Sequence, residues 1–297
     1  MTGGGTATVA HTTEPSLLEA PTDPTYYQAG SDVSVDELSL QNELERVRDP
    51  DDPEPIESVA QNLEGALNLS WTLTDNNWHD VVFNDGTNSS FVKGRPVFSR
   101  WWIGVDYLDG IAERVLKGAI VTQVQIQYQQ GGKIQISLNL IYADEELNTA
   151  ITPTSIQKSS DIKMWHDLDL SVDNVTDVSC DKLQSLTLQI DTGARFQRGG
   201  SRKACDAVIG AVDSTLTTDA IFTEASKDRV EIAYGSTGAS SPETSLTAVD
   251  ATLTIMNTDY SLSGLKPNTV GWDSVVDPES DTQDNTEYHV SGVEVTA

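Results

Sequence analysis

The chain has 297 residues, of which 46 are acidic and 18 are basic, giving a net charge of −28 at pH 7. This charge opposes compaction in dilute buffer, but at about 1 M salt the Debye length falls to about 3 Å and the repulsion is screened. The composition therefore favours a protein of a salt-rich, halophilic cell over an ordinary acidic protein. It argues against tight binding of nucleic acid, which needs basic patches.

Residues 1–55 predict an acidic N-terminal arm that is interrupted by prolines. Its first twenty residues do not have the pattern of a secretory signal, and no window of the chain reaches the roughly twenty apolar residues of a membrane helix. Within the arm, Asp36–Arg48 is interpreted as a short helix whose apolar face holds Leu38, Leu40, Leu44 and Val47. The arm either packs on a neighbouring surface or is a solvated tail.

A domain of alternating strands is predicted over residues 56–262. Leu67 to Leu73 alternates with polar residues, as does the hairpin Ala119–Tyr142 with its Gln130-Gly131-Gly132 turn. Ala143–Trp165 loses this periodicity and predicts a long loop. Other strands are expected at Val97–Val105, Leu168–Val172, Val178–Asp191, Ala207–Leu216, Val230–Tyr234 and Ala251–Met256. Residues 263–297 predict a loosely patterned C-terminal extension with one strand near Tyr288–Val295.

One strand-and-helix pattern occurs twice, about 144 residues apart. Ala66–Asp75 precedes a short helix over 76–83, and Ala211–Asp219 precedes another over 220–225, with Asp75 and Asp219 as the predicted N-caps. The sequence thus predicts an all-β sandwich or partial barrel with one or two short helices and duplicated halves.

The polar faces of the predicted strands carry few carboxylates in an otherwise acidic chain. Residues 66–74, 119–142 and 182–190 contain neither Asp nor Glu. We interpret these faces as surfaces that pack on other subunits or line a confined passage. The alternative is that Asp and Glu are avoided only because they are poor strand formers.

No catalytic or metal-binding pattern appears in the sequence. His11, His79, His166 and His289 do not have the spacing of a zinc site, and no nucleophile elbow or phosphate loop is present. The acidic run at 49–54 lacks the glycine bend of a calcium loop. We expect no enzyme activity, cofactor or metal. Cys180 and Cys205 form either a bridge or two separate thiols.

The order of elements resembles that of the major tail tube proteins of long-tailed viruses, here of a haloarchaeal virus. The likeness covers about residues 56–257. It is clearest in Asp177-Val178-Ser179, in Leu186-Thr187-Leu188-Gln189-Ile190-Asp191 and in Gly210–Thr217.

The resemblance implies hexameric rings that stack into a hollow conduit for genome delivery. It implies an inner wall lined by the hairpin residues Gln123, Gln125, Gln127, Gln129, Gln135, Ser137 and Asn139. It also implies an inter-ring loop that includes Asp144, Glu145, Glu146, Ile151, Ile156 and Trp165. The implied partners are copies of the chain itself, a tape measure protein, and terminator or baseplate proteins. Viral DNA passes without tight binding, no membrane is involved, and the virion tail assembles in the host cytoplasm.

A different class of function remains open. A secreted halophilic sandwich that binds carbohydrate or acts as an adhesin could use tryptophans to stack on sugars. The candidates are Trp71, Trp78, Trp101, Trp102, Trp165 and Trp272. The absence of a signal sequence disfavours this alternative.

Overall fold

The computed structural model describes residues 7–48, 50–51, 54–83, 89–90, 95–107, 110–147, 152–153, 155–176, 182–277 and 279–296. The first part of the chain contains β1 (Ala7–Glu14), β2 (Tyr26–Gln28), β3 (Ser31–Gln41), β4 (Leu44–Arg48), β5 (Pro55–Ala60), β6 (Glu64–Thr72), α1 (His79–Val82), β7 (Ser89–Ser90), β8 (Phe98–Tyr107), β9 (Gly110–Gln129), β10 (Gln135–Tyr142), β11 (Asp144–Leu147) and β12 (Ile156–Gln157). The second part contains the 3-10 helix η2 (Trp165–Asp167), β13 (Leu168–Val172), β14 (Leu183–Asp191), β15 (Arg195–Arg198), β16 (Ala204–Val208), β17 (Asp213–Ile221), α2 (Glu224–Tyr234), β18 (Val249–Ile255), β19 (Thr258–Asp273), β20 (Gln283–Val290) and β21 (Gly292–Thr296). The protein is therefore all-β with short helices, as the sequence predicted.

One continuous antiparallel sheet forms the centre of the molecule. Its described strands follow the order β3-β6-β10-β9-β14-β17-β20-β19. Along these strands buried apolar residues alternate with polar ones, for example in β10, where Ile136, Leu138 and Leu140 are buried. One face of this inner sheet is thus apolar and the other polar.

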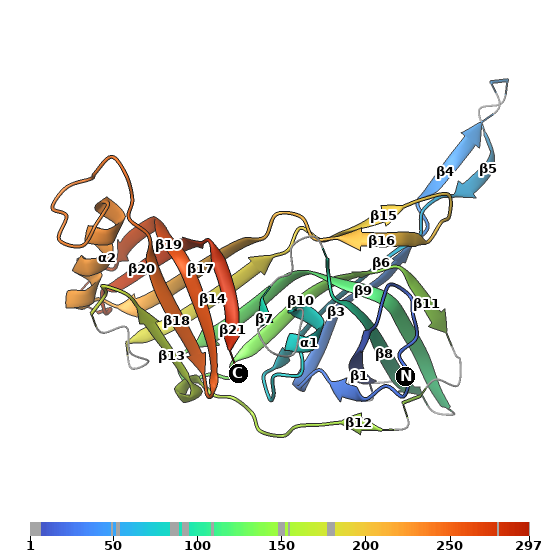
Figure 1. Cartoon of the computed structure of the whole chain (residues 1–297), viewed down its shortest axis with the longest axis horizontal. Coiled ribbons are helices and arrows are strands. Elements are labelled where there is room, and N and C mark those ends of the chain that lie inside the picture. Colours follow the sequence, from blue (N-terminus) through green and yellow to red (C-terminus); the bar gives the residue numbers. More distant parts are fainter. Residues whose placement is uncertain are drawn as a thin grey trace.

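Two smaller outer sheets cover the apolar face. The first contains β2, β1, β8, the beginning of β9 and β11, with β12 added to β2 in parallel. The second contains β13, β18, the beginning of β19, β21 and β7. The long strands β9 and β19 each continue from an outer sheet into the inner sheet. Figure 1 shows the two resulting halves side by side along the long axis.

The two halves repeat the same topology, element by element. β3, β6, β9 and β10 pair in the order β3-β6-β10-β9, and β14, β17, β19 and β20 pair in the order β14-β17-β20-β19. A helix follows β6 and β17, a short hairpin (β4–β5 or β15–β16) precedes each, and β1, β8 and β11 have counterparts in β13, β18 and β21. The structure is a tandem duplication of one fold unit.

Strand registers give the correspondence between the halves. Leu67 pairs with Leu140, and Leu216 pairs with Tyr288, at equivalent places, so the repeat is 149 residues long between β6 and β17 and 148 between β10 and β20. The predicted spacing of about 144 residues was wrong. It matched Asp75 with Asp219, but Asp219 lies inside β17 and corresponds to Ser70.

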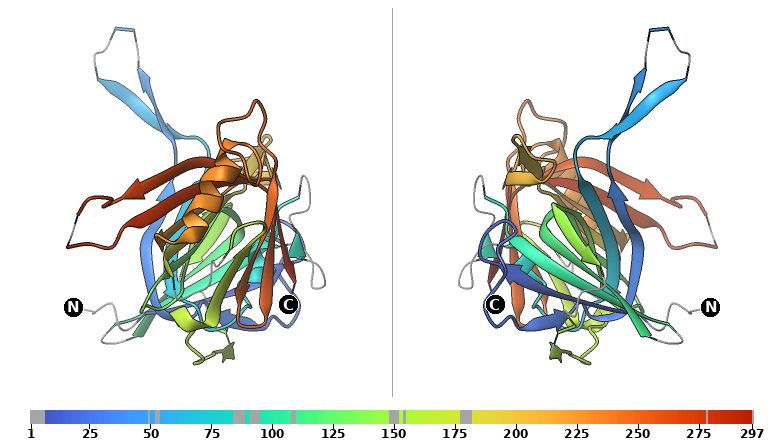
Figure 2. Two further views of the ribbon diagram at one scale, coloured as in Figure 1. Left: turned by 90° about the vertical axis from the view of Figure 1, so that its left-hand side faces the viewer. Right: turned by 90° about the vertical axis from the view of Figure 1, so that its right-hand side faces the viewer.

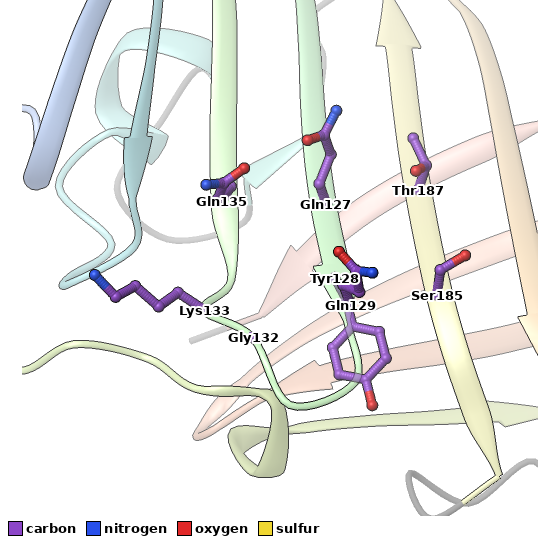
Figure 3. A pocket seen from close by; sticks show the side chains of 8 residues that line it. All are labelled: Gln127, Tyr128, Gln129, Gly132, Lys133, Gln135, Ser185 and Thr187. Atoms are coloured by element: carbon purple, nitrogen blue, oxygen red, sulfur yellow. The ribbon is translucent and has the colours of Figure 1, made fainter.

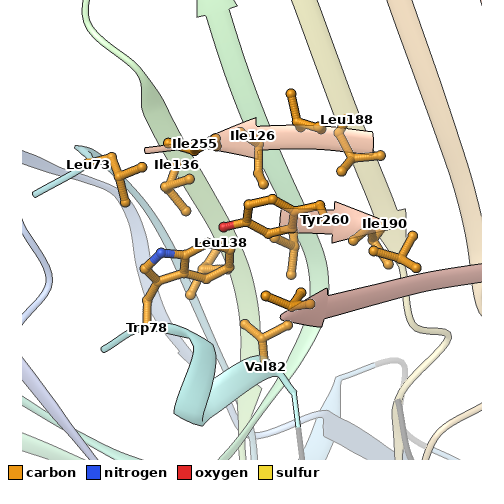
Figure 4. Packing of buried hydrophobic residues seen from close by; sticks show 14 of the residues in the cluster. Leu73, Trp78, Val82, Ile126, Ile136, Leu138, Leu188, Ile190, Ile255 and Tyr260 are labelled. Carbon is orange, nitrogen blue, oxygen red and sulfur yellow. The ribbon is translucent and has the colours of Figure 1, made fainter. Parts of the chain in front are cut away.

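The hydrophobic core lies between the inner sheet and the outer sheets. In Figure 4, Trp78 and Val82 of the α1 region point at Leu138 of β10 and Tyr260 of β19. The imidazole Nε2 of His79 lies 2.7 Å from the Tyr260 hydroxyl oxygen. Because α1 belongs to the first half and β19 to the second, the two halves share one core, and this polar contact is among those that join them.

Several predicted elements are confirmed, and others are wrong. The hairpin of β9 and β10 turns at Gly131, whose φ of 77° suits glycine. The expected helix over Asp36–Arg48 is instead the end of β3 followed by β4. The expected strand Val230–Tyr234 lies in α2, and the expected strand Ala207–Leu216 is broken between β16 and β17.

The two helices begin later than the sequence indicated. The predicted cap Asp75 accepts a hydrogen bond from the Asn77 backbone N–H at 3.0 Å, but α1 begins at His79. The second helix begins at Glu224 with Thr223 as its N-cap, and the region predicted to begin it, at 220–221, still belongs to β17.

Strands cross both predicted domain boundaries. β1 pairs with β8 and β3 pairs with β6, so residues 7–41 belong to the sheets, and the part that projects is the β4–β5 hairpin (Figure 1). β19 runs through the predicted boundary at 262. The segment after it, predicted to be loosely patterned with one strand, contributes to β19, β20 and β21. The division into 1–55, 56–262 and 263–297 stays a prediction about folding units.

Candidate functional site: the polar face of the inner sheet

The predicted lining residues lie together on the polar face of β9 and β10. Gln135, Ser137 and Asn139 stand directly opposite Gln127, Gln125 and Gln123 in the antiparallel register. Their neighbours in sequence, such as Val124, Ile126 and Leu138, are buried on the other face. The structure thus groups these residues on one surface, whereas their role in lining a channel stays a prediction.

Side-chain amides on this face are hydrogen bonded to one another. Asn139 donates to Gln123 at 2.8 Å, Gln123 donates to Asp191 at 2.7 Å, and Gln127 donates to Gln125 at 2.9 Å. Cross-strand contacts of this kind fix the side chains of a sheet surface. The face is a rigid layer of neutral amides and not a set of freely moving polar groups.

The polar face does carry carboxylates on its second half. Asp191, Asp219 and Glu287 lie on β14, β17 and β20 and were not anticipated from the carboxylate-free segments. Each accepts hydrogen bonds from neighbours, for example Asp219 from Ser185 and Asn285, both at 2.5 Å. The positions that correspond to these three in the first half, Gln41, Ser70 and Asn139, are neutral, although Glu37 of β3 also lies on this face and accepts a hydrogen bond from Asn68.

The face is hollowed at the turn end of the hairpin. Figure 3 shows this depression, which is lined by Gln127, Tyr128, Gln129, Gly132, Lys133, Gln135, Ser185 and Thr187. The Lys133 ammonium lies 2.5 Å from the Asp32 carboxylate, so its charge is paired at the rim. The hollow is polar, and two of its hydroxyl groups are engaged in the fold: Ser185 donates to Asp219 and Tyr128 donates to the Leu183 carbonyl.

The proposed inter-ring residues are anchored within the chain. Asp144, Glu145 and Glu146 lie in β11, not in a loop, and they form ion pairs with Lys203, Arg114 and Lys117. Ile156 packs in β12 against a small cluster around Tyr26, and Trp165 is partly buried against the core. Ile151 lies outside the described residues. Their role between rings is untested.

The buried polar groups are structural. Burial lowers the pKa of His11 and of His79 to about 4, so both rings are neutral. Burial also raises the pKa of Tyr260 above its usual value. Within the described ranges, no three His, Cys, Asp or Glu side chains come together as a metal site would require.

Tryptophans are placed mainly in the core. Trp71, Trp78, Trp101 and Trp102 are all buried, and Trp272 is 45% exposed. Cys205 is an exposed free thiol, and Cys180 lies outside the described residues. Among the residues that the structure describes, no helix is long and apolar enough to cross a membrane.

The fold and this surface define a class: an all-β subunit whose inner sheet presents one polar face. Comparison with protein families matches residues 2–290 to the phage tail tube protein family, and the chain belongs to that family. It is therefore a tail structural protein and virion component, and not an enzyme, because this family is structural.

Solved structures include a similar chain in the cryo-EM structure of the anti-feeding prophage baseplate, 6-fold symmetrised. That similarity has a TM-score of 0.34 and 14% identity, and it covers 49% of this chain and 94% of that chain. A comparison with curated proteins gave no match.

Proposed function

We propose that this protein forms closed rings that stack into the tail tube, with the polar face of the inner sheet turned towards the bore. The observation that carries the proposal is the form of that sheet. It is long, continuous, apolar on one face and polar on the other, and within the described residues its two outermost strands pair on one side only. Closure into a barrel is the arrangement that removes such edges. The resemblance implies six chains per ring. Because each chain holds two four-stranded units, three chains also give a ring of six units.

The chemistry of the polar face suits a passage for DNA. Its segments 123–129, 135–139, 185–191, 215–219 and 283–287 contain neither Lys nor Arg. In β19, Lys266 stands opposite His289 where this strand enters the inner sheet. Since affinity for nucleic acid comes mainly from cations that contact phosphates, a wall of amides and carboxylates does not retain the duplex. The DNA thus passes through the tube without binding tightly to its wall.

Stacking of rings needs contacts at both ends of the subunit. On one side the β4–β5 hairpin projects from the body, as both views of Figure 2 show, and its Leu44 and Ile56 side chains are 63% and 64% exposed. Residues 155–165 of the predicted inter-ring segment, which include β12, lie at the opposite end in Figure 1. We propose that these two segments meet between successive rings.

Other components follow from the same proposal. The tube would surround a tape measure protein and end on terminator and baseplate proteins, and it would assemble in the host cytoplasm. The net charge of −28 supports assembly in a salt-rich, haloarchaeal host, because high salt screens repulsion between subunits.

Electron microscopy of the purified protein at high salt tests the proposal, with Gln125→Glu or Gln127→Glu as variants. We expect tubes with an axial bore for the wild type. Each variant should need more salt to form tubes, because it brings like charges together around a closed ring. Gln197→Glu, on the exposed hairpin β15, is the control with the same charge change. Wild-type protein that stays monomeric would refute the tube, and variants that assemble like the control would refute the lining.

A further inference from the structure

We propose that the free edge of β19 pairs with the free edge of β3 in a second copy of the chain, and that three chains close the ring. This inference rests on the proposed tube and specifies its interface. It replaces the six chains per ring expected from the sequence. The duplication supports this pairing, because the junction between the two halves of one chain shows how one unit joins the next.

The internal junction is the pairing of β9 with β14. Ile126 stands opposite Leu188 and Val124 opposite Ile190, and each of these four side chains is at most 1% exposed. On the polar face, Gln125 stands opposite Gln189. The last strand of the first unit thus joins the first strand of the second unit through an apolar seam with a polar surface.

The same two edges exist once more, unpaired, at the ends of the inner sheet. β19 is the counterpart of β9, and both strands carry a register shift at the equivalent place, near Asn268 and Thr122. β3 is the counterpart of β14, because Leu38 pairs with Leu67 as Leu188 pairs with Leu216. Within the described chain, β3 pairs with β6 alone, and residues 266–273 of β19 pair with β20 alone.

Transferring the internal register gives the expected pairs between chains. Trp272 takes the place of Ile126 and Leu38 that of Leu188, so these two residues should meet across the interface. Val270 should likewise meet Leu40. In the single chain Trp272 and Leu40 are 45% and 38% exposed, and Val270 and Leu38 are half-buried.

These exposed apolar residues lie where the internal junction has fully buried ones. A long edge strand with exposed apolar side chains invites pairing, and natural sheets usually protect such edges with charge or short strands. The Trp272 ring is held in place by an edge contact with Phe222, at 4.9 Å between ring centroids. The β19 side of the interface is therefore already ordered in the single chain, and β3 of a second copy can pair with it.

The number of chains follows from the size of the barrel. With strands about 4.8 Å apart and tilted by about 40°, three chains of eight inner strands form a barrel about 48 Å across, and six chains form one about 95 Å across. Side chains on the two walls take up about 10 Å. Three chains thus leave a bore of about 38 Å, two leave about 22 Å, and a DNA duplex is about 20 Å wide. Two chains leave no room for the water around a duplex, and six chains leave a bore several times wider than the duplex. Three chains therefore form the smallest ring that admits a hydrated duplex.

Cysteine cross-linking tests both the register and the number of chains. The variant Ser39→Cys/Gly271→Cys, in a background with Cys180→Ser and Cys205→Ser, places two thiols on the polar face at the counterparts of Gln189 and Gln125. A Cβ at Gly271 meets no atom within 4 Å, so this change fits the fold. Tubes assembled at high salt are oxidised, dissolved in denaturant and separated on a non-reducing gel. We expect a ladder that ends at three chains.

Two control variants give the result its meaning. Gln125→Cys/Gln189→Cys should form a bridge within one chain, because these residues already face each other. Ser39→Cys/Val270→Cys should not link chains, because Val270 faces the core. A ladder that continues to six chains would overturn the three-chain ring. Tubes in which Ser39→Cys/Gly271→Cys forms no link would overturn the edge pairing while leaving the tube itself intact. Protein that forms neither tubes nor links would refute the proposed function together with this inference.

Discussion

Single residues mark where the duplicated halves have diverged. Asp284 of β20 occupies the place of Ile136 in β10, and Thr286 that of Leu138, so the second half has polar groups in a position where the first has a purely apolar layer. Asp284 is fully buried and pairs with Arg229 of α2 at 2.7 Å. This ion pair fixes α2 on the inner sheet, whereas α1 is held by apolar packing around Trp78.

Removing one partner of that buried pair should lower the free energy of unfolding more than replacing both partners with apolar residues. Arg229→Met leaves the Asp284 carboxylate buried without its partner, so the free energy of unfolding should fall by about 3–5 kcal/mol. Arg229→Met/Asp284→Ile, which restores the residue type of the first half, should recover most of this loss. Urea unfolding at high salt measures both. Equal losses for the single and double variants would contradict this reading of the pair.

The two buried histidines should make the fold sensitive to mild acid. The pKa of His11 is about 4 in the fold and about 6.5 in the unfolded chain, so the unfolded state binds more protons between these values. The contribution of His11 to the free energy of unfolding is therefore fully present above about pH 6.5. It is smaller by about 2 kcal/mol at pH 5. His79 behaves in the same way.

Thermal unfolding at pH 7 and pH 5 measures this loss. His11→Phe should remove about half of the pH dependence, since the new ring cannot be protonated and His11 already lies against Trp101. His166→Phe is the control, because the His166 side chain is 60% exposed. An unchanged pH dependence in His11→Phe would show that this ring does not carry the effect.

At the scale of elements, strands with clear alternation were predictable and those shaped by tertiary contacts were not. The hairpin of β9 and β10 follows from a period of two and a glycine turn. In contrast, the segment 36–48 has apolar residues whose spacing also suits a helix: Leu38, Leu40, Leu44 and Val47. It forms strands because β3 pairs with β6 and β4 pairs with β5. The segment 230–234 is rich in apolar residues but belongs to a helix docked through Arg229.

The candidate surface could be predicted better than its context. The alternation of Gln123, Gln125 and Gln127 identified one polar face, but Asp191 and Asp219 came onto the same face only through β14 and β17. The seven predicted lining residues all come from one hairpin. Strands were also predicted over parts of β6, β14, β17 and β20, but local pattern did not show that they pair into the same sheet. The duplication was predicted from one repeated pattern, but its spacing was wrong, because the halves share topology and only a few residues.

One position in the proposed seam should control its salt requirement. Asp273 takes the place of Gln127 and Glu37 that of Thr187, so two carboxylates face each other between chains where the internal junction has neutral residues. Asp273→Asn should therefore assemble tubes at lower salt than wild type, as followed by light scattering. Asp169→Asn, an exposed residue of β13, changes the net charge equally and should shift assembly less. Equal shifts would show that only net charge matters.

At the scale of the whole molecule, assembly depends on three features together: the two repeated units, the high negative charge and the two open sheet edges. Repulsion from a net charge of −28 keeps free chains apart, and salt screening together with the apolar seam allows them to join. The duplication supplies one junction within each chain, so that half of the contacts around a ring are covalently secured. Only the β19–β3 contact remains to be formed during assembly.

A cryo-EM reconstruction of tubes assembled at high salt tests this account most directly. We predict a continuous inner barrel in which β19 of each chain pairs with β3 of the next, with three chains per ring and the Gln125 face turned to the bore. Particles that remain single molecules, or tubes whose inner wall is formed by another surface, would contradict it.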